Sequence, residues 1–319
     1  MDLTAEAMGT KIRLVSDTTH QISEDQLNDA FAAALTEIRR LEALMTTWKP
    51  DSELSQVNAN PGQWRTISRE TLEVLQKSRW ASELSGGAFD ITFRSMGNIW
   101  KFGDAAEASP QLPDPQLLKQ RIKLIDFHKV ELDAAKSQVR LAPNTSVDLG
   151  GIAKGYAVDR AANILKQRGV QSFLLQAGGD LYGAGVKPDG TPWTSGIRDP
   201  RGEKEEPFAL IQLQDHAFST AGDYARAFIL DGKRYHHIID PKTGYPATRS
   251  RSVTIWSKDA FTADAIDDAV FILGPEKGLP LVESLDGVGV VIVDSKNHVL
   301  VSPRLEGKVH VLSQPTDGL

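Results

Sequence analysis

The segment VDLGGIAKGYAVD, residues 147–159, decides how this sequence is interpreted. Val147–Leu149 predicts a buried strand, Gly150–Gly151 predicts a turn, and Ala153–Gln167 predicts a helix. Backbone N–H groups at such a helix start can face an anion, and Lys154 adds a positive charge in the first turn. The glycine spacing matches neither the G-x-G-x-x-G pattern nor the P-loop. From spacing alone, an anion site and an ordinary strand-to-helix turn are equally open interpretations.

The segments on both sides of this stretch mix helices and strands without regular alternation. Ser23 and Gln26 form a capping box before apolar residues at helical spacing, which predicts a helix over Glu24–Met45. Asp231-Gly232 is a hairpin turn signal. We therefore expect an α+β fold rather than a doubly wound sheet. The other predicted elements are helices over Ser68–Ser85 and Thr262–Leu273 and strands over Thr10–Val15, Val130–Leu132, Val139–Leu141, Ser172–Gln176, Tyr224–Leu230, Arg234–Ile239, Ser252–Ser257, Gly287–Val293, Val299–Val301 and Val309–Leu312.

Length and composition indicate an ordinary globular protein and exclude several classes. The chain has 319 residues, of which 40% are hydrophobic and 24% are charged, and we expect one large domain over residues 1–319. Asp104–Pro115 and Asp199–Pro207 have the composition of surface loops. A net charge of −6 provides no electrostatic footprint for nucleic acid.

Cysteine is absent, which excludes disulfides, thiolate metal sites and a cysteine nucleophile. No apolar run reaches the roughly 18 residues of a transmembrane helix. The start, MDLTAEAMGTKIRLV, lacks the basic and apolar regions of a signal peptide. The sequence is therefore that of a cytoplasmic protein, or it begins after an export signal that has been removed.

Three further motifs carry residues suited to chemistry. In ADAIDDA (263–269), Asp264, Asp267 and Asp268 share one helix face, and carboxylates of this kind suit Mg²⁺, although acids near a helix start are also favoured by its dipole. In RYHHIIDPKTGYP (234–246), His236 and His237 should point to opposite faces of a strand.

Two glycine turns, GGAFD and QAGGD, end in Asp90 and Asp180, for which local capping is the simpler interpretation. Taken together, the motifs indicate a site for a phosphorylated ligand with a divalent ion.

In this order, the motifs resemble those of the ApbE family, the FAD:protein FMN transferases. The resemblance implies a Mg²⁺-dependent enzyme that cleaves FAD, attaches FMN to a Thr or Ser hydroxyl of a redox flavoprotein, and releases AMP. The implied fold is related to the tunnelling fold, with mixed sheets, flanking helices and two lobes around a flavin cleft. The matching landmarks are Met8-Gly9-Thr10, TTWKPDSELSQVN (46–58), GGAFDIT (86–92), VDLGGIAKGYAVD, QAGGDLYGAG (176–185), FSTAGDY (218–224), HHIIDPKTGYP (236–246) and the Asp264 helix.

The resemblance also implies site residues. The metal ligands would be the backbone carbonyl near Gly151 together with Asp264 and Asp268. Many members have Thr or Ser at the last of these positions, and the added carboxylate changes the charge of the site. The residues at flavin-contacting positions would be Met8, Trp48 (where the family often has Tyr), Ala88, Phe89, Asp90, Asp148, Lys154 and Ile239.

Transfer to a hydroxyl needs a general base, because the pKa of the hydroxyl lies far above 7. His237 is the first candidate, since a free imidazole with a pKa near 6.5 is largely neutral at pH 7, and Asp180 is the second. An FAD pyrophosphatase that releases FMN and AMP, and a flavin-binding protein without turnover, remain alternatives. The family's acceptors face the outside of the cytoplasmic membrane, which implies a periplasmic protein; a cytoplasmic location stays open.

Overall fold

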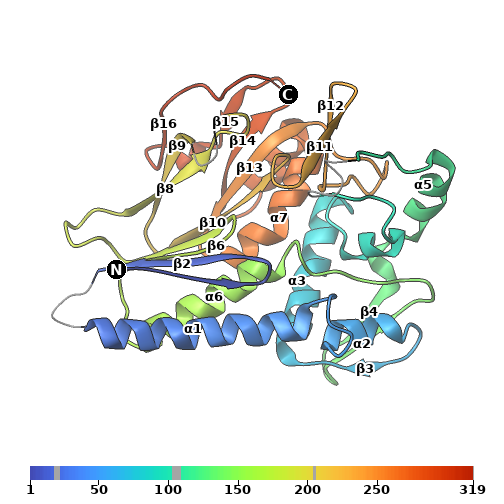
Figure 1. Cartoon of the computed structure of the whole chain (residues 1–319), viewed down its shortest axis with the longest axis horizontal. Helices are drawn as coiled ribbons and strands as arrows, with labels where there is room; N and C mark the ends of the chain where they lie inside the picture. Colours follow the sequence, from blue (N-terminus) through green and yellow to red (C-terminus); the bar gives the residue numbers. More distant parts are fainter. Residues whose placement is uncertain (18–21, 103–108, 204–205, 319) are drawn as a thin grey trace.

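The computed structural model describes residues 1–17, 22–102, 109–203 and 206–318, and its elements form three layers (Figure 1). The middle layer is an 8-stranded sheet of order β1-β2-β6-β7-β10-β13-β14-β15. Every neighbouring pair in it is antiparallel. Its strands are β1 (Asp2–Ala7), β2 (Thr10–Ser16), β6 (Phe173–Ala177), β7 (Asp180–Ala184), β10 (His216–Gly222), β13 (Ser250–Ser257), β14 (Gly289–Asp294) and β15 (Val299–Val301).

Helices cover one face of this sheet and enclose the larger apolar core with it (Figure 1). The long helices are α1 (Glu24–Met45), α3 (Arg69–Ser85), α6 (Ala153–Gln167) and α7 (Ala260–Leu273). Helix α7 packs on α3, α6, β10 and β13, so it lies at the centre of this layer. The shorter helices are α2 (Glu53–Ala59), α5 (Pro115–Arg121), α8 (Pro275–Glu283) and the 3₁₀ helices η1 (Ile91–Met96), η2 (Ile122–Leu124), η3 (Phe127–Lys129) and η4 (Pro303–Leu305).

A smaller sheet covers the opposite face. Its order is β16-β9-β8, and it encloses a second apolar core with Leu181, Phe218 and Trp256 of the large sheet. Two further small sheets, β3-β5-β4 and β11-β12, lie outside these layers. The strands of the small sheets are β3 (Arg65–Thr66), β4 (Val130–Asp133), β5 (Gln138–Leu141), β8 (Trp193–Arg198), β9 (Pro207–Leu213), β11 (Ala227–Leu230), β12 (Lys233–His236) and β16 (Val309–Val311).

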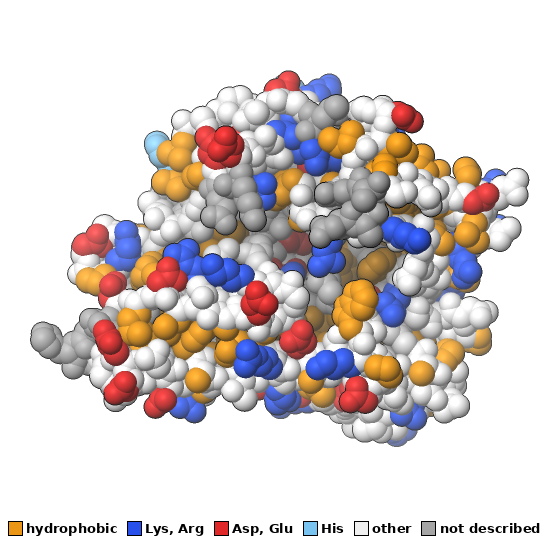
Figure 2. Space-filling model, in the orientation of Figure 1, with side chains coloured by type: hydrophobic (Ala, Val, Ile, Leu, Met, Phe, Trp, Pro, Cys, Tyr) orange, Lys and Arg blue, Asp and Glu red, His pale blue; other side chains and the backbone are white. Residues whose placement is uncertain are grey.

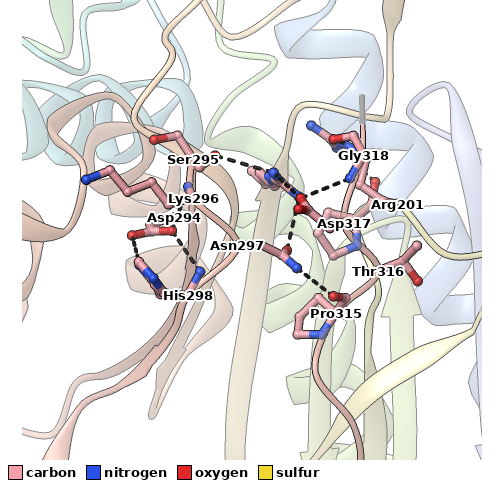
Figure 3. Close-up of polar contacts among 12 residues, drawn as sticks. Arg201, Asp294, Ser295, Lys296, Asn297, His298, Pro315, Thr316, Asp317 and Gly318 are labelled. Carbon is pink, nitrogen blue, oxygen red and sulfur yellow. Dashed lines mark hydrogen bonds and ion pairs between the residues drawn. The ribbon is translucent and has the colours of Figure 1, made fainter.

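The C-terminal segment is held against the molecule by polar contacts (Figure 3). Asn297 Nδ2 donates a hydrogen bond to the Pro315 carbonyl over 2.6 Å. Arg251 forms an ion pair with Asp317 at 2.8 Å. These contacts fasten the end of the chain beside the turn between β14 and β15.

The predicted α+β fold is confirmed, and the two best-marked helices have the predicted bounds. Helix α1 begins after a capping box in which Ser23 and Gln26 bond each other's backbone, and it buries one apolar stripe. Helix α6 ends before Gly169, which has a φ of 90°. Glycine adopts such a positive φ readily because it has no Cβ. In both helices, local signals and the buried face agree.

The predicted strand at Val147–Leu149 is wrong. This segment belongs to no sheet, because the side chain of Asn58 takes the place of a partner strand. Asn58 Oδ1 accepts from the Val147 N–H over 2.7 Å, and its Nδ2 donates to the Val147 carbonyl over 2.9 Å. The hairpin at Asp231-Gly232 exists, but its strands are shorter than predicted: β11 begins at Ala227 and β12 ends at His236.

The two predicted loops lie partly outside the described residues. In Asp104–Pro115, residues 109–114 belong to no helix or strand, Pro115 begins α5, and residues 104–108 are not described. In Asp199–Pro207, Pro207 begins β9 and residues 204–205 are not described. None of the helices in the described part of the chain combines the length and the hydropathy that crossing a bilayer requires.

Candidate functional site

The centre of the site is the ammonium group of Lys154, at the start of α6. It lies 3.0 Å from Asp180 Oδ2 at the start of β7 and 3.3 Å from Asp264 Oδ1 in α7. The other oxygen of Asp264 accepts the backbone N–H of Gly155 over 2.7 Å. Asp180 and Asp264 are almost fully buried. The motif at 147–159 and the predicted carboxylate helix therefore meet at one lysine.

Two further carboxyl groups of α7 join this cluster. Asp267 Oδ2 and Asp180 Oδ1 each lie 2.6 Å from the hydroxyl of Ser219 on β10. One hydroxyl has one hydrogen and cannot donate to both groups, so the second contact needs a proton on a carboxyl group. Burial, together with the charges of Asp268 and Asp264, raises the pKa of Asp267 well above its usual range, which makes Asp267 the group that holds this proton.

The cluster carries more negative than positive charge. Burial and the charge of Asp180 raise the pKa of Asp264 to about 7. Burial raises the pKa of Asp268 to about 6, although Lys154 opposes this shift. Burial also disfavours the charge of Lys154, but Asp180 and Asp264 outweigh it and raise the lysine pKa. Four carboxyl groups around one ammonium group make a site in which a further cation is stabilising.

The oxygen atoms suit the metal that the sequence predicts. Asp268 Oδ2 lies 3.2 Å from the place that a Cβ on Gly151 would occupy, so glycine leaves this carboxylate room beside the turn before α6. Phe89 Cε2 lies 3.5 Å from the same place. In the described residues no three carboxylate or imidazole side chains converge as a complete ligand set, and the predicted set needs only Asp264, Asp268 and one carbonyl. Hard oxygen donors of this kind fit Mg²⁺.

The two adjacent histidines have different surroundings. His236 is buried; its Nε2 lies 2.8 Å from the Ala247 carbonyl, and its Nδ1 accepts the Ile238 N–H over 3.3 Å. Both ring nitrogens thus serve the backbone, and His236 is structural.

His237 follows β12, and its side chain is exposed. Surrounding protein atoms that strip hydration from its ring, and the charges of His236 and Arg226, nevertheless lower the pKa of His237 to about 4, with a smaller contribution from Lys154. The expectation of an ordinary imidazole pKa near 6.5 is therefore corrected. The influence of Lys154 also places His237 within electrostatic reach of the cluster.

Several residues at predicted flavin positions lie in turns or loops between elements. Met8 lies in the turn between β1 and β2 with a φ of 53°. This turn adjoins the glycine turn before β7, because a Cβ on Gly178 would lie 2.8 Å from Thr10 Oγ1. Trp48, between α1 and α2, is 91% exposed, so its ring has a free face. Ile239 is half-buried and bridges to Pro246.

The two remaining acids at predicted flavin positions bond to the protein itself. Asp90 Oδ1 accepts the backbone N–H and the hydroxyl of Thr92, and its Oδ2 accepts the Phe127 N–H. Asp90 therefore caps local N–H groups, which is the simpler of the two interpretations of its glycine turn. The neighbouring residues Ala88 and Phe89 are buried. Asp148 accepts from the Thr47 hydroxyl over 2.9 Å and pairs with Arg94 at 3.3 Å.

Asp180 is placed to hold Lys154 rather than to receive a proton from an acceptor. Its side chain is buried, with one oxygen on Ser219 and the other on Lys154. The role of second candidate base therefore conflicts with its position, because a general base must reach the proton that it accepts.

Sequence reasoning missed three residues of the site. Ser219 lies within the motif FSTAGDY (218–224), but the sequence does not indicate which residues a serine in a strand will bond. Gly155 had a signal, since glycine within a helix indicates close packing: its Cβ would lie 2.3 Å from the Ala260 carbonyl. Asp159 accepts the first two N–H groups of α7, from Ala260 and Phe261, over 2.9 Å each.

Figure 2 shows this face of the molecule hollowed near its centre, with charged side chains around the hollow.

Comparison with known proteins finds relatives that match most of the chain. The model of the ApbE family matches residues 8–292. The FAD:protein FMN transferase of Treponema pallidum is 32% identical over 303 residues, covering 90% of this chain and 83% of that protein. The FAD:protein FMN transferase of Haemophilus influenzae is 32% identical over 307 residues, covering 93% and 87%.

Solved structures give the same result. The ApbE protein of Thermotoga maritima superposes with a TM-score of 0.85 at 30% identity, over 97% of this chain and 98% of that chain. The flavin transferase ApbE of Vibrio cholerae superposes with a TM-score of 0.82 at 28% identity, over 97% and 98%. Sequence and fold agree over almost the whole length, and the chain therefore belongs to the ApbE family.

Proposed function

We propose that this protein is an FAD:protein FMN transferase that depends on Mg²⁺, attaches FMN to a Thr or Ser hydroxyl of an acceptor flavoprotein, and releases AMP. One observation carries the proposal. Lys154, Asp264 and Asp268 converge beside Gly151, in a chain whose curated relatives are named FAD:protein FMN transferases. A pyrophosphate with its metal has the charge that such a cluster accommodates.

Asp264, Asp268 and the carbonyl near Gly151 would hold the Mg²⁺ ion. When bound, the ion would neutralise charge on the pyrophosphate, which is the main requirement of phosphoryl transfer. Asp180 holds the ammonium group of Lys154 in place through their 3.0 Å ion pair. Lys154 thus adds a fixed positive charge near the phosphates while it offsets the carboxylates.

The transfer exchanges one phosphorus–oxygen bond for another. The acceptor hydroxyl oxygen forms a bond to the phosphorus of the FMN half, and the bond from that phosphorus to the bridging oxygen breaks. AMP leaves with the bridging oxygen. His237 accepts the hydroxyl proton, a role that its solvent-exposed side chain supports, because an acceptor hydroxyl can reach it.

The remaining contacts concern the flavin and the partner. The flavin half would be contacted by Met8, Trp48, Ala88, Phe89, Asp148 and Ile239 and by the turn at Asp90. The acceptor would be a redox flavoprotein that carries the Thr or Ser modification motif. Its position outside the cytoplasmic membrane makes a periplasmic location part of the proposal, which fractionation of the native host would test.

The deciding experiment combines the protein with FAD, Mg²⁺ and a purified acceptor domain. Flavin fluorescence that stays on the acceptor after denaturation, with one AMP released per label, is the expected result. An acceptor whose target Thr or Ser is replaced by Ala is the matched control. Release of free FMN with an unlabelled acceptor would mean that the protein is an FAD pyrophosphatase, and unchanged FAD would mean that it only binds flavin.

A further inference from the structure

The hairpin that carries His237 has a small aromatic core of its own. Strands β11 and β12 form a separate 2-stranded sheet, and a hairpin of two strands is marginally stable by itself. Phe228 and Tyr235 are buried in this core, and Trp100, Phe102 and Leu230 pack against them. Side-chain packing therefore sets the position of the hairpin.

Trp100 connects this core to the chain on both sides of His237. Its ring centroid lies 6.0 Å from that of Tyr235, two residues before His237. On the returning arm of the turn, its centroid lies 5.8 Å from that of Tyr245. Its Nε1–H donates to the Gly244 carbonyl over 2.7 Å. One side chain thus touches the strand that leads to His237 and the turn that follows it.

The turn that Trp100 holds is rigid. The Gly244 N–H donates to the Asp240 carbonyl over 2.8 Å, and the Asp240 N–H donates to the Tyr245 carbonyl over 2.9 Å. Gly244 has a φ of 73°, and a Cβ there would lie 2.5 Å from Ile122 Cγ2. The turn is thus closed by hydrogen bonds and packed against η2, and His237 lies between it and the hairpin, where its own N–H donates to the Arg226 carbonyl over 3.1 Å.

We propose that Trp100 is a positioning residue for His237, which it keeps oriented toward Lys154 and the acceptor hydroxyl by clamping β12 to the turn over residues 240–246. The inference rests on the proposed function, in which His237 accepts the proton. Trp100 itself touches neither the lysine cluster nor His237 among its ring and hydrogen-bond contacts in the described residues. Its removal should therefore slow transfer without weakening FAD binding.

Two substitutions separate packing from hydrogen bonding. Trp100→Ala removes the ring and the donor, and Trp100→Phe keeps a ring but loses the donor. We expect Trp100→Ala to lower the transfer rate at saturating FAD by about 10-fold or more, since small displacements of catalytic groups have large effects. Trp100→Phe should lie between Trp100→Ala and wild type. Trp64→Ala is the control, because Trp64 is an exposed tryptophan just before β3 whose ring packs on Arg140, and it should leave the rate unchanged.

A double-mutant cycle tests whether Trp100 acts through His237. In a His237→Ala background, Trp100→Ala should have almost no further effect on the rate, because the group that it positions is gone. An equal loss in both backgrounds would overturn the proposal. So would a rise in the Kd for FAD by the same factor as the loss in rate, which would make Trp100 a binding residue.

A second readout does not depend on activity. His237 is identified in imidazole NMR spectra by comparison with His237→Ala, and its titration is followed in wild type and in Trp100→Phe. The titratable or charged groups that influence its pKa are His236, Arg226 and Lys154. Displacement should move its pKa toward that of free histidine, whereas an unchanged titration in a folded variant contradicts the proposal. If wild type transfers no FMN, the proposed function fails, and this titration alone decides whether Trp100 holds His237 in place.

Discussion

At the scale of single residues, the site is defined by an imbalance of charge. Asp180, Asp264, Asp267 and Asp268 lie around the ammonium group of Lys154, and the first three of these acids are almost fully buried. Buried charges of one sign are costly, and this cost raises the pKa values of Asp264, Asp267 and Asp268. A bound divalent cation removes that cost and makes the carboxylates charged again.

We expect Asp264→Ala to abolish Mg²⁺-dependent turnover while most FAD affinity remains. The reason is that Asp264 orders both Lys154 and the start of α6, whereas the proposed flavin contacts lie on other turns. Turnover and FAD binding are measured separately, by AMP release and by flavin fluorescence. Full activity of this variant at saturating FAD, or undiminished wild-type activity in excess chelator, would contradict the metal assignment.

The second acid of the proposed ligand set predicts a different outcome. Asp268→Thr removes the carboxylate but still offers an oxygen at the position where the family resemblance leads us to expect Thr or Ser, so activity should be retained. Because one negative charge is lost, the Mg²⁺ concentration that supports half-maximal activity should rise. Loss of activity at all Mg²⁺ concentrations would show that the carboxylate of Asp268 has a role of its own.

The two histidines should respond differently to mutation. His237→Ala should lower the transfer rate by about 10²-fold, the usual scale for loss of a general base, with FAD affinity little changed. His236→Ala should instead lower stability by about 1–3 kcal/mol, because the Ala247 carbonyl and the Ile238 N–H lose their buried partner. Rates and thermal midpoints of both variants test this, and the reverse order would make His236 the candidate base.

The pH dependence follows from the surroundings of His237. Its pKa of about 4 means that the ring is neutral throughout the range from pH 5 to 8. Protonation of His237 should therefore cause no loss of transfer near pH 6.5, and its contribution should be lost only as the pH falls toward about 4, separately from any loss caused by protonation of Asp264 and Asp268. A profile of kcat/KM in wild type and in His237→Ala tests this; an acid limb near pH 6.5 that disappears in the variant would contradict the lowered pKa.

At the scale of elements, the site depends on how closely α6 and α7 approach. Because Gly155 has no side chain, the Asp264 carboxylate can reach the Gly155 N–H. Asp159, in the neighbouring helix α6, caps the start of α7. The two helices thus hold Lys154 and Asp264 in one geometry through backbone contacts. Beside them, Ser219 joins β10 to the same cluster.

We expect Gly155→Ala to destabilise the protein by about 1–3 kcal/mol, the usual cost of overpacking. The added methyl group would lie 2.3 Å from the Ala260 carbonyl and 2.6 Å from Asp264 Cβ, so α7 must move. Activity should fall with stability, because Asp264 moves with the helix. Asn163→Ala, on the exposed side of α6, is the matched control and should be neutral or slightly stabilising. Equal denaturation midpoints for the two variants would show that the helices tolerate separation.

At the scale of the whole molecule, the site lies where the helical layer meets the large sheet. Asp180 and Ser219 come from two neighbouring strands, paired in register, and Lys154 and the acids of α7 come from the helices that cover them. Asp180 and Ser219 face the helices while Leu181 and Phe218 face the small sheet, since successive strand residues alternate between faces. The polar site is thus enclosed by the same packing that stabilises the fold.

The stability of the metal-free protein should fall as the pH rises from about 4 toward 7. The pKa values of Asp264 and Asp159 are raised to about 7, so the folded state keeps protons that the unfolded chain has lost in this range. The lowered pKa values of His236 and His237 act in the opposite direction below about pH 6.5, so the decrease should be clearest as the pH rises from about 6.5 to 7.

Thermal midpoints with and without Mg²⁺ at constant ionic strength measure this effect. Mg²⁺ should raise the midpoint at pH 7.5 more than at pH 5, because protonated carboxyl groups are poor ligands. Asp264→Ala is the control and should show little of the Mg²⁺ effect. An equal effect of Mg²⁺ at both pH values would contradict a carboxylate site.

Many elements of the fold can be predicted from residues that are close together in the sequence. The capping box at Ser23 and the apolar stripe behind it predict α1 at both ends, because helix bonds and caps join residues close in sequence. The glycines around Lys154 likewise predict α6. The order of the motifs was enough to indicate the family, and the three acids of α7 were visible as one helix face.

Only the tertiary structure decided which groups these residues meet. Val147–Leu149 looks like a strand, but Asn58, 89 residues away, takes the place of a strand partner. Ser219 is buried in β10 because it bonds Asp180 and Asp267, 39 and 48 residues away. The lowered pKa of His237 arises mainly from protein atoms around its ring and from the charges of His236 and Arg226, and it includes a contribution from Lys154, 83 residues away in the sequence. Helix signals act within a few residues and can be found in the sequence, whereas burial and charge depend on distances in space that the folded chain alone creates.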